Sequence, residues 1–159
     1  MGDKKAKILF VDDDNFLRKV YKAELSEQGY DVILAADGEE GLEKAKIADP
    51  DLIILDMIMP KKNGFEVLTE LQNDHNTQNI PVIILSNLGQ EDDIKKGLDL
   101  GAVDYLVKDN ITLTTIVEKV SLYLNSKTRS KVAKMKNNHS EKKEDQPEVK
   151  DVDKSNLVY

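Results

Sequence analysis

Four short apolar runs of this chain are each followed at once by polar side chains that can take part in chemistry. Asp12 and Asp13 follow KILFV, and Asp56 follows LIIL. Ser86 follows VIIL, and Lys108 follows YLV. If these runs are parallel strands of one sheet, all five side chains lie at its carboxyl edge. That edge is where open α/β sheets bind their ligands.

This set of groups suits the transfer of a phosphoryl group onto a carboxylate. Clustered carboxylates repel one another and bind Mg²⁺, which also coordinates phosphoryl oxygens. One aspartate can act as the nucleophile, while the cation, Lys108 and Ser86 stabilise the phosphoryl oxygens. Each residue alone has an ordinary structural explanation, because aspartates after strands commonly form turns or cap helices. Their convergence on one predicted sheet edge favours the chemical interpretation.

The apolar pattern up to about residue 125 predicts strands that alternate with helices. The expected strands are Lys7–Val11, Val32–Ala35, Leu52–Leu55, Val82–Leu85 and Tyr105–Val107. Helices are expected between Asn15 and Gly29 and over residues 37–46, 63–72, 90–101 and 112–124. Asn15 is the expected N-cap of the first helix, with Asp14 as a turn or capping residue. This alternation predicts an α/β fold, a parallel sheet with helices on both faces.

The composition limits the classes of function. No G-x-G-x-x-G or P-loop pattern supports a nucleotide site, and no apolar run approaches the roughly 18 residues of a membrane helix. Residues 1–125 carry 24 acidic and 14 basic side chains, which argues against nucleic-acid binding by this part of the chain. The absence of cysteine and of a secretion signal favours a cytoplasmic location.

The character of the chain changes at Ser126. Residues 126–159 carry 6 acidic and 9 basic side chains and a single aromatic residue, Tyr159. Such a segment buries too little apolar surface to offset the entropy lost on ordering. We therefore expect one domain over residues 1–125. We expect a disordered charged tail over residues 126–159, the start of which could extend the last helix to about residue 136.

Four segments resemble the receiver domain of bacterial two-component response regulators: ILFVDDDNFLRK, PDLIILDMIMPKKNGFEVL, PVIILSN and GAVDYLVK. The resemblance covers about residues 6–125, and its motifs are specific in residue type and order. It implies a flavodoxin-like doubly wound sheet of five strands in the order 2-1-3-4-5, with five helices, as in the chemotaxis regulators of this family. It also implies a phosphorylation-dependent signalling switch rather than an enzyme. The phosphoryl group would come from a sensor histidine kinase, a phosphotransfer protein or a small phosphodonor.

The resemblance also assigns roles around a divalent cation. By position, Asp56 is the phosphoryl acceptor. Asp13 ligates Mg²⁺ directly, and Asp12 helps to hold it through water. The backbone carbonyl of Ile58 supplies another ligand, and Mn²⁺ is a candidate substitute for Mg²⁺.

Three further residues take family roles beside the phosphoryl group. Ser86 is the switch hydroxyl, Lys108 contacts the phosphoryl group, and Tyr105 is the aromatic that turns inward when the hydroxyl moves. The family usually has a cis proline after the lysine, whereas Asp109 follows Lys108 here. Because a cis bond before a non-proline residue costs about 2.5–4 kcal/mol, we expect a trans bond.

Output is expected through an unidentified partner protein, with no DNA-binding domain after Leu124. The expected output surface combines the helix at 90–101, the strand at 105–107 and the helix at 112–124. Gly97 lies inside the first of these helices, which predicts a weakly stable element suited to rearrangement. The resemblance also places apolar Ile58 and Leu88 beside the path of a hydrolytic water, which predicts slow self-dephosphorylation.

Two alternatives stay open at this point. Asp12 and Asp14 form the D-x-D of haloacid-dehalogenase-type phosphatases, in which the first aspartate is the nucleophile. Against this reading, Phe16 stands where that family has Thr or Val, and no late acidic pair follows Lys108. The other alternative is a receiver-like binding module without phosphorylation, which the full set of site residues disfavours.

Overall fold

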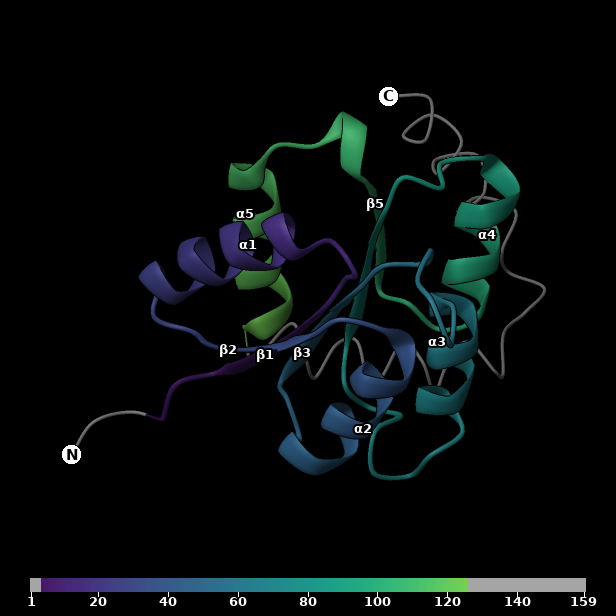
Figure 1. Cartoon of the computed structure of the whole chain (residues 1–159), viewed down its shortest axis with the longest axis horizontal. Coiled ribbons are helices and arrows are strands. Elements are labelled where there is room, and N and C mark those ends of the chain that lie inside the picture. Colours follow the sequence, from purple (N-terminus) through teal and green to yellow (C-terminus); the bar gives the residue numbers. More distant parts are fainter. Residues whose placement is uncertain (1–3, 126–159) are drawn as a thin grey trace.

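A computed structural model describes residues 4–125 as one parallel five-stranded sheet with helices on both faces (Figure 1). The strands are β1 (Lys7–Val11), β2 (Asp31–Ala35), β3 (Leu52–Leu55), β4 (Val82–Ser86) and β5 (Asp104–Val107). The helices are α1 (Asn15–Glu27), α2 (Gly38–Ala48), α3 (Gly64–Gln72), α4 (Glu91–Asp99) and α5 (Leu113–Leu124), with a 3₁₀ turn η1 (Lys108–Asn110). The predicted tail at residues 126–159 and the extension of the last helix into it lie outside the described residues.

The strand order is β2-β1-β3-β4-β5, which confirms the predicted flavodoxin-like topology. Every neighbouring pair is parallel. The chain adds β2 on one side of β1 and β3 on the other, so the strand order reverses at β1. The carboxyl ends of β1 and β3 are therefore neighbours. Because Val11 pairs with Leu55, the residues that follow them, Asp12 and Asp56, leave the sheet side by side.

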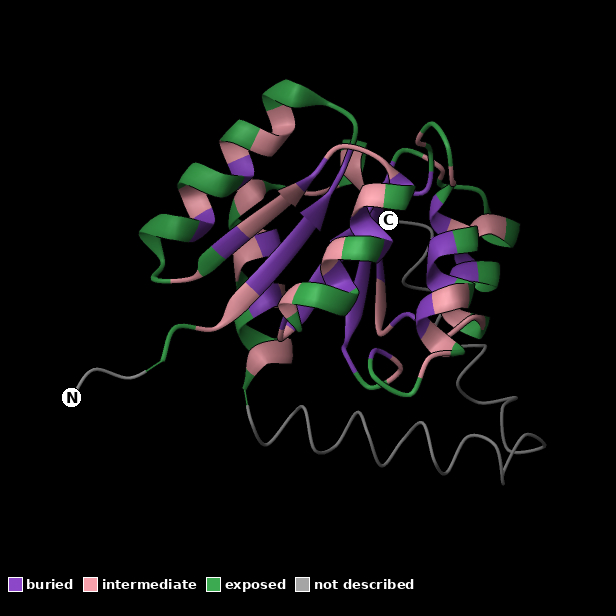
Figure 2. Ribbon diagram, turned by 60° about the horizontal axis from the view of Figure 1, so that its bottom comes forward, coloured by how far each residue is buried: buried purple, intermediate pink, exposed green. Residues whose placement is uncertain are grey.

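The core consists of two apolar layers, one on each face of the sheet. Helices α1 and α5 cover one face (Figure 1). On that face Tyr21, Leu25, Ile116 and Val120 belong to the buried apolar layer. Helices α2, α3 and α4 cover the other face. All residues of β3 and β4 are buried (Figure 2), which explains why LIIL and VIIL are continuous apolar runs instead of alternating ones.

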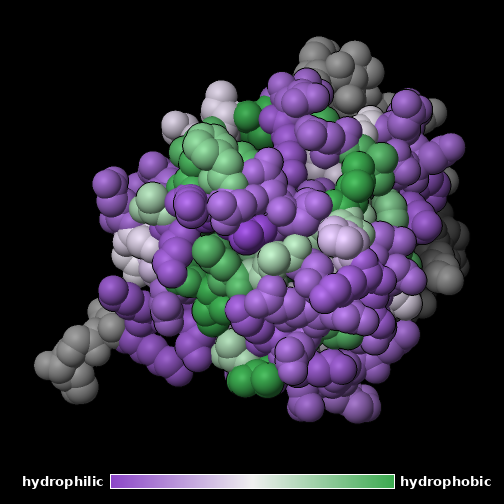
Figure 3. Space-filling model, viewed as in Figure 1, coloured by the Kyte–Doolittle hydropathy of each residue, from purple (hydrophilic) through white to green (hydrophobic). Residues whose placement is uncertain are grey.

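The outer surface is mostly polar. Figure 3 shows hydrophilic side chains over much of one face of the molecule, with apolar patches between them. Four large apolar side chains are exposed within residues 4–125: Phe16, Ile47, Ile58 and Leu122. No helix of this part of the chain combines the length and apolarity needed to cross a membrane.

The N-terminus of α1 differs from the prediction. Asp14, not Asn15, is the N-cap residue, and its Oδ1 accepts hydrogen bonds from the amides of Phe16 at 2.9 Å and Leu17 at 3.1 Å. Asn15 is the first helical residue, so the prediction of Asn15 as N-cap was wrong, whereas the capping role predicted for Asp14 is confirmed. The extended backbone of Asp14 (φ −82°, ψ 110°) lets its carboxylate reach two free amides of the first turn.

Gly97 has a packing role that its effect on helix propensity did not indicate. The residue is buried, and a Cβ atom there would lie 2.5 Å from Ile84 Cδ1 and 2.9 Å from Tyr105 Cδ2. The missing side chain therefore lets α4 lie directly on side chains of β4 and β5.

We predict that Gly97→Ala lowers the free energy of unfolding by about 1 kcal/mol. Ala is favoured over Gly in an open helix by about 1 kcal/mol, but forcing a methyl group into a filled core costs about 1–3 kcal/mol. Urea unfolding measures the difference. Lys95→Ala, at an exposed position of the same helix, is the control and should change stability by less than about 0.5 kcal/mol. A stabilised Gly97→Ala variant would contradict the packing role.

Candidate functional site

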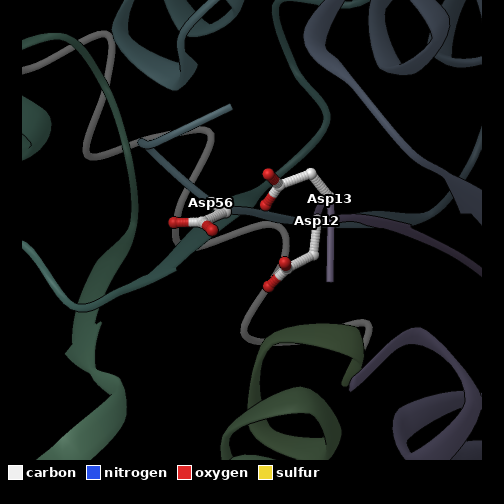
Figure 4. A group of neighbouring side chains, drawn as sticks. All are labelled: Asp12, Asp13 and Asp56. Carbon is white, nitrogen blue, oxygen red and sulfur yellow. The ribbon is translucent and has the colours of Figure 1, made fainter. Parts of the chain in front are cut away.

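Three carboxylates meet at the carboxyl ends of β1 and β3. One oxygen each of Asp12, Asp13 and Asp56 lies within 4.8 Å of the others (Figure 4). Asp12 and Asp56 are buried, with 1% and 5% of their surface exposed, whereas Asp13 is exposed. The pairing of β1 with β3 brings Asp12 and Asp56 together, and Asp13 lies on the solvent side of the cluster.

Lys108, which follows the edge strand β5, completes the cluster. Its Nζ donates to Asp12 Oδ2 at 2.7 Å and to Asp56 Oδ2 at 3.2 Å. Since β4 lies between β3 and β5, the lysine side chain spans the end of β4 to reach both carboxylates. Only 15% of this side chain is exposed, so one partly buried ammonium group links the ends of β1, β3 and β5.

The charges of the cluster are only partly balanced. Burial raises the pKa of Asp12, and the charge of Asp56 adds to this, although hydrogen bonds from Lys108 and the Asp14 amide oppose it. Burial by itself lowers the pKa of Lys108, but its hydrogen bond to Asp12 and the two negative charges outweigh that, so its pKa is raised. Lys108 is therefore a cation at neutral pH, facing more than one negative charge.

The donor set fits a small hard cation. Mg²⁺ prefers oxygen ligands and is commonly bound by one or two carboxylates together with water and phosphoryl oxygens. Two buried carboxylates and one exposed carboxylate offer such ligands and a route for water. The raised pKa of Asp12 marks a carboxylate whose burial is not fully compensated by its neighbours. A divalent cation would supply that compensation.

The loop after β3 holds Asp56 in place. Asp56 Oδ1 accepts hydrogen bonds from the amides of Met57 at 2.7 Å and Ile58 at 3.3 Å. The amide of Gly64 donates to the Met57 carbonyl at 2.9 Å. A Cβ atom at Gly64 would lie 2.2 Å from the Asp56 backbone oxygen, so only glycine allows α3 to begin this close to the loop after Asp56.

Ser86 and Tyr105 are linked to each other through Leu88. Ser86 is fully buried, and its Oγ accepts a hydrogen bond from the Leu88 amide at 3.3 Å. The Tyr105 hydroxyl donates to the Leu88 carbonyl at 2.5 Å. No hydrogen bond or ion pair within residues 4–125 joins Ser86 directly to Asp56 or Lys108. The loop after β4 thus connects the two switch candidates through backbone groups, which no side-chain motif could have indicated.

The remaining predicted features are placed as follows. The Lys108–Asp109 bond is trans, as expected, since residues 4–125 contain no cis peptide bond. Asp109 is exposed in η1. Ile58, two residues after Asp56, is 53% exposed. Its backbone carbonyl as a cation ligand stays a prediction.

Comparisons with known proteins agree on one family. Residues 8–121 match the family model of the response regulator receiver domain. Response regulator RR06 of Streptococcus pneumoniae is 42% identical over 113 residues, which cover 71% of this chain and 50% of that protein. The DNA-binding dual master transcriptional regulator RpaA of Synechocystis is 44% identical over 102 residues, covering 64% and 42%. This chain therefore matches about half or less of the length of these relatives.

Solved structures show the same similarity. The receiver domain of the Francisella response regulator 1452 superposes with a TM-score of 0.70 at 32% identity, covering 76% of this chain and 97% of that one. The chemotaxis protein CheY4 of Vibrio cholerae gives 0.69 at 32% identity, covering 74% and 98%. None of these matches supports the phosphatase alternative with Asp12 as nucleophile.

The buried Tyr105 hydroxyl predicts a loss of stability at alkaline pH. Burial, with the charges of Asp93 and Asp56, raises the pKa of Tyr105 to about 12. The unfolded chain ionises this tyrosine near pH 10, so its contribution to stability is present below about pH 10 and is lost as pH rises through about 12. Between about pH 9 and about pH 11, the free energy of unfolding should fall by about 1 kcal/mol more in the parent than in Tyr105→Phe.

Urea unfolding of both proteins at each pH measures this difference. The difference in their free energies of unfolding at neutral pH reports the lost hydrogen bond to Leu88 and is subtracted as the baseline. Equal pH dependence in the two proteins would show that Tyr105 does not stay protonated in the folded state.

Proposed function

The chain belongs to the response regulator receiver domain family of two-component signalling, and on that premise we propose that Asp56 is its phosphoryl acceptor. The observation that carries this proposal is the contact of Lys108 Nζ with both Asp12 and Asp56 in a cluster of three carboxylates. Both carboxylates also accept hydrogen bonds from their own loops, Asp12 from the Asp14 amide and Asp56 from the amides of Met57 and Ile58. This arrangement fixes the direction of an attacking carboxylate and places a positive charge beside it. The choice of Asp56 over Asp12 rests on its position in the receiver-domain family.

The proposed reaction moves one phosphoryl group. A carboxylate oxygen of Asp56 attacks the phosphorus atom of a phosphohistidine, and the new bond is that of an acyl phosphate. The phosphorus–nitrogen bond breaks, and its electron pair stays on the imidazole nitrogen. Lys108 lies 3.2 Å from Asp56 Oδ2 and is placed to stabilise negative charge on the transferred oxygens.

We propose that Asp12, Asp13 and Asp56 hold Mg²⁺, with the Ile58 carbonyl as a further ligand and Mn²⁺ as a substitute. The support is the all-oxygen donor set and the incomplete compensation of Asp12. When bound, the cation neutralises carboxylate charge that would otherwise repel an incoming phosphate dianion. The side chains contribute alignment, because Asp12 is fixed by Lys108 and by the Asp14 amide.

The proposed partners are a sensor histidine kinase or phosphotransfer protein and a downstream protein. Output would pass through the surface of α4, β5 and α5, which adjoins Tyr105 and the Leu88 loop. Residues 1–125 would act as the receiver domain, in the cytoplasm. Their 24 acidic and 14 basic side chains favour a protein target over direct nucleic-acid contact by this domain.

We predict that acetyl phosphate with Mg²⁺ adds one phosphoryl group to the parent and none to Asp56→Asn. The amide cannot attack phosphorus as a carboxylate does, although its size is the same. Intact mass spectrometry gives the extent, and peptide mapping gives the residue. Asp109→Asn is the matched control, because Asp109 is exposed and adjacent to Lys108, and it should be modified like the parent. Full modification of Asp56→Asn, or phosphate on Asp12, would refute the assignment.

We predict that Ile58→Asn/Leu88→Glu shortens the lifetime of the phosphorylated state. Ile58 is exposed beside the acceptor, and neither parent side chain can hydrogen-bond a water that attacks the acyl phosphate. A well-positioned polar group accelerates such a step by about 10²–10⁴-fold, and mobile side chains give less, so we expect about tenfold.

Phosphate loss is followed after removal of the donor. Ile47→Asn makes the same kind of change at an exposed site in α2 and should keep the parent lifetime. A double variant with the parent lifetime would show that the apolar pair does not control hydrolysis.

A further inference from the structure

Arg18 links the end of β1 to the start of α1. It is the only arginine in residues 1–125, beside 13 lysines. Its Nη1 donates to the backbone carbonyl of Asp12 at 2.8 Å, and its Nη2 donates to Asn15 Oδ1 at 3.2 Å. One planar guanidinium group therefore bridges the two ends of the loop that carries the three consecutive aspartates.

The carbonyl that Arg18 binds is the first one beyond the paired part of β1. Val11 is the last residue of β1 in register with both neighbouring strands, and its carbonyl accepts from the Asp56 amide. The Asp12 amide still donates to the Ala35 carbonyl at 3.1 Å. The Asp12 carbonyl then receives its hydrogen bond from Arg18 instead of a strand. Arg18 thus holds the peptide group between Asp12 and Asp13.

That peptide group decides where the Asp13 side chain points. The carboxylate of Asp12 is held by Lys108 and the Asp14 amide, and that of Asp56 by Lys108 and its own loop. Within residues 4–125, no hydrogen bond or ion pair holds the carboxylate of Asp13. Figure 4 shows this carboxylate lying toward Asp56, and the backbone sets the direction of the Cα–Cβ bond from which it extends.

We propose that Arg18 is a positioning residue for the divalent-cation site, acting through the Asp12–Asp13 peptide group to aim Asp13 at Asp56. This inference rests on the proposed function, since the cation is the one that Asp56 chemistry requires. Arginine suits the role because its rigid fork binds two acceptors in a fixed plane, which a lysine ammonium group does not do. Its positive charge alone would have the opposite effect, because it repels a dication. Charge and positioning can therefore be separated by experiment.

The test measures Mg²⁺ binding to the full chain by calorimetry, without a phosphodonor. Removing a group that orients a metal ligand from outside typically weakens binding about 10–100-fold. Since Arg18 acts through the backbone, we expect about tenfold for both Arg18→Lys and Arg18→Gln. Lys19→Gln removes the same charge from the next, exposed residue and should bind Mg²⁺ like the parent.

The Mg²⁺ dependence of phosphorylation gives a readout that a general structural defect would not produce. In Arg18→Lys, the half-saturating Mg²⁺ concentration should rise about tenfold, while the rate at saturating Mg²⁺ returns to that of the parent. A rate that stays low at every Mg²⁺ concentration would overturn the proposal. If the circular dichroism spectrum of Arg18→Gln shows that this variant does not fold like the parent, the Mg²⁺ affinity of Asn15→Ala is measured in its place. That variant removes one of the two acceptors of the guanidinium group, and unchanged Mg²⁺ affinity there would overturn the proposal.

Two further outcomes of the calorimetry would also overturn it. One is parent-like affinity in both Arg18 variants. The other is tighter binding by Arg18→Gln with parent-like Arg18→Lys, which would show that only the charge matters. Failure of the proposed function looks different, since the parent itself would then not bind Mg²⁺ or would not be phosphorylated on Asp56.

Discussion

Repulsion between carboxylates at adjacent strand ends is the constraint on which this site depends. The pairing of Val11 with Leu55 leaves Asp12 and Asp56 side by side in a buried position. A single ammonium group, from Lys108, contacts both. With Asp13 nearby, negative charge remains in excess, so the site is prepared to take up more positive charge. The excess of negative charge thus follows from the register of two strands and from the reach of one lysine side chain.

The same cluster is in contact with the helices that could transmit its state. The loop after Asp56 leads into α3 at Gly64, where there is no room for a side chain. The next residue is Phe65, and the ammonium group of Lys96 in α4 lies over its ring, 4.4 Å from the ring centre. The next residue of α4, Gly97, packs on Tyr105, and the Tyr105 hydroxyl donates to the Leu88 carbonyl. Helix α4 therefore contacts elements that leave the site by two separate routes, α3 and β5.

Much of the fold could be predicted, because its signals are local. Continuous apolar runs gave β1 and β3 with their observed bounds, and the other strands within one residue at an end. The alternation of strands and helices limited the sheet to a parallel one, and the resemblance to receiver domains supplied the strand order. The N-cap of α1 was misassigned because Asp14 and Asn15 are both good capping residues. The backbone angles of the loop after β1 decide between them.

The sequence by itself determined which groups come to one edge, since parallel strands bring their carboxyl ends together and four of the five ends carry or adjoin the polar residues. Only the tertiary structure decided how they meet. The bridging of Asp12 and Asp56 by Lys108 depends on strand order and side-chain reach across β4. The links through the Leu88 and Asp12 carbonyls use backbone atoms, which are the same in every residue and so leave no trace in residue type. The role of Gly97 depends on how closely α4 approaches Tyr105, a distance that is set by packing between segments far apart in the chain.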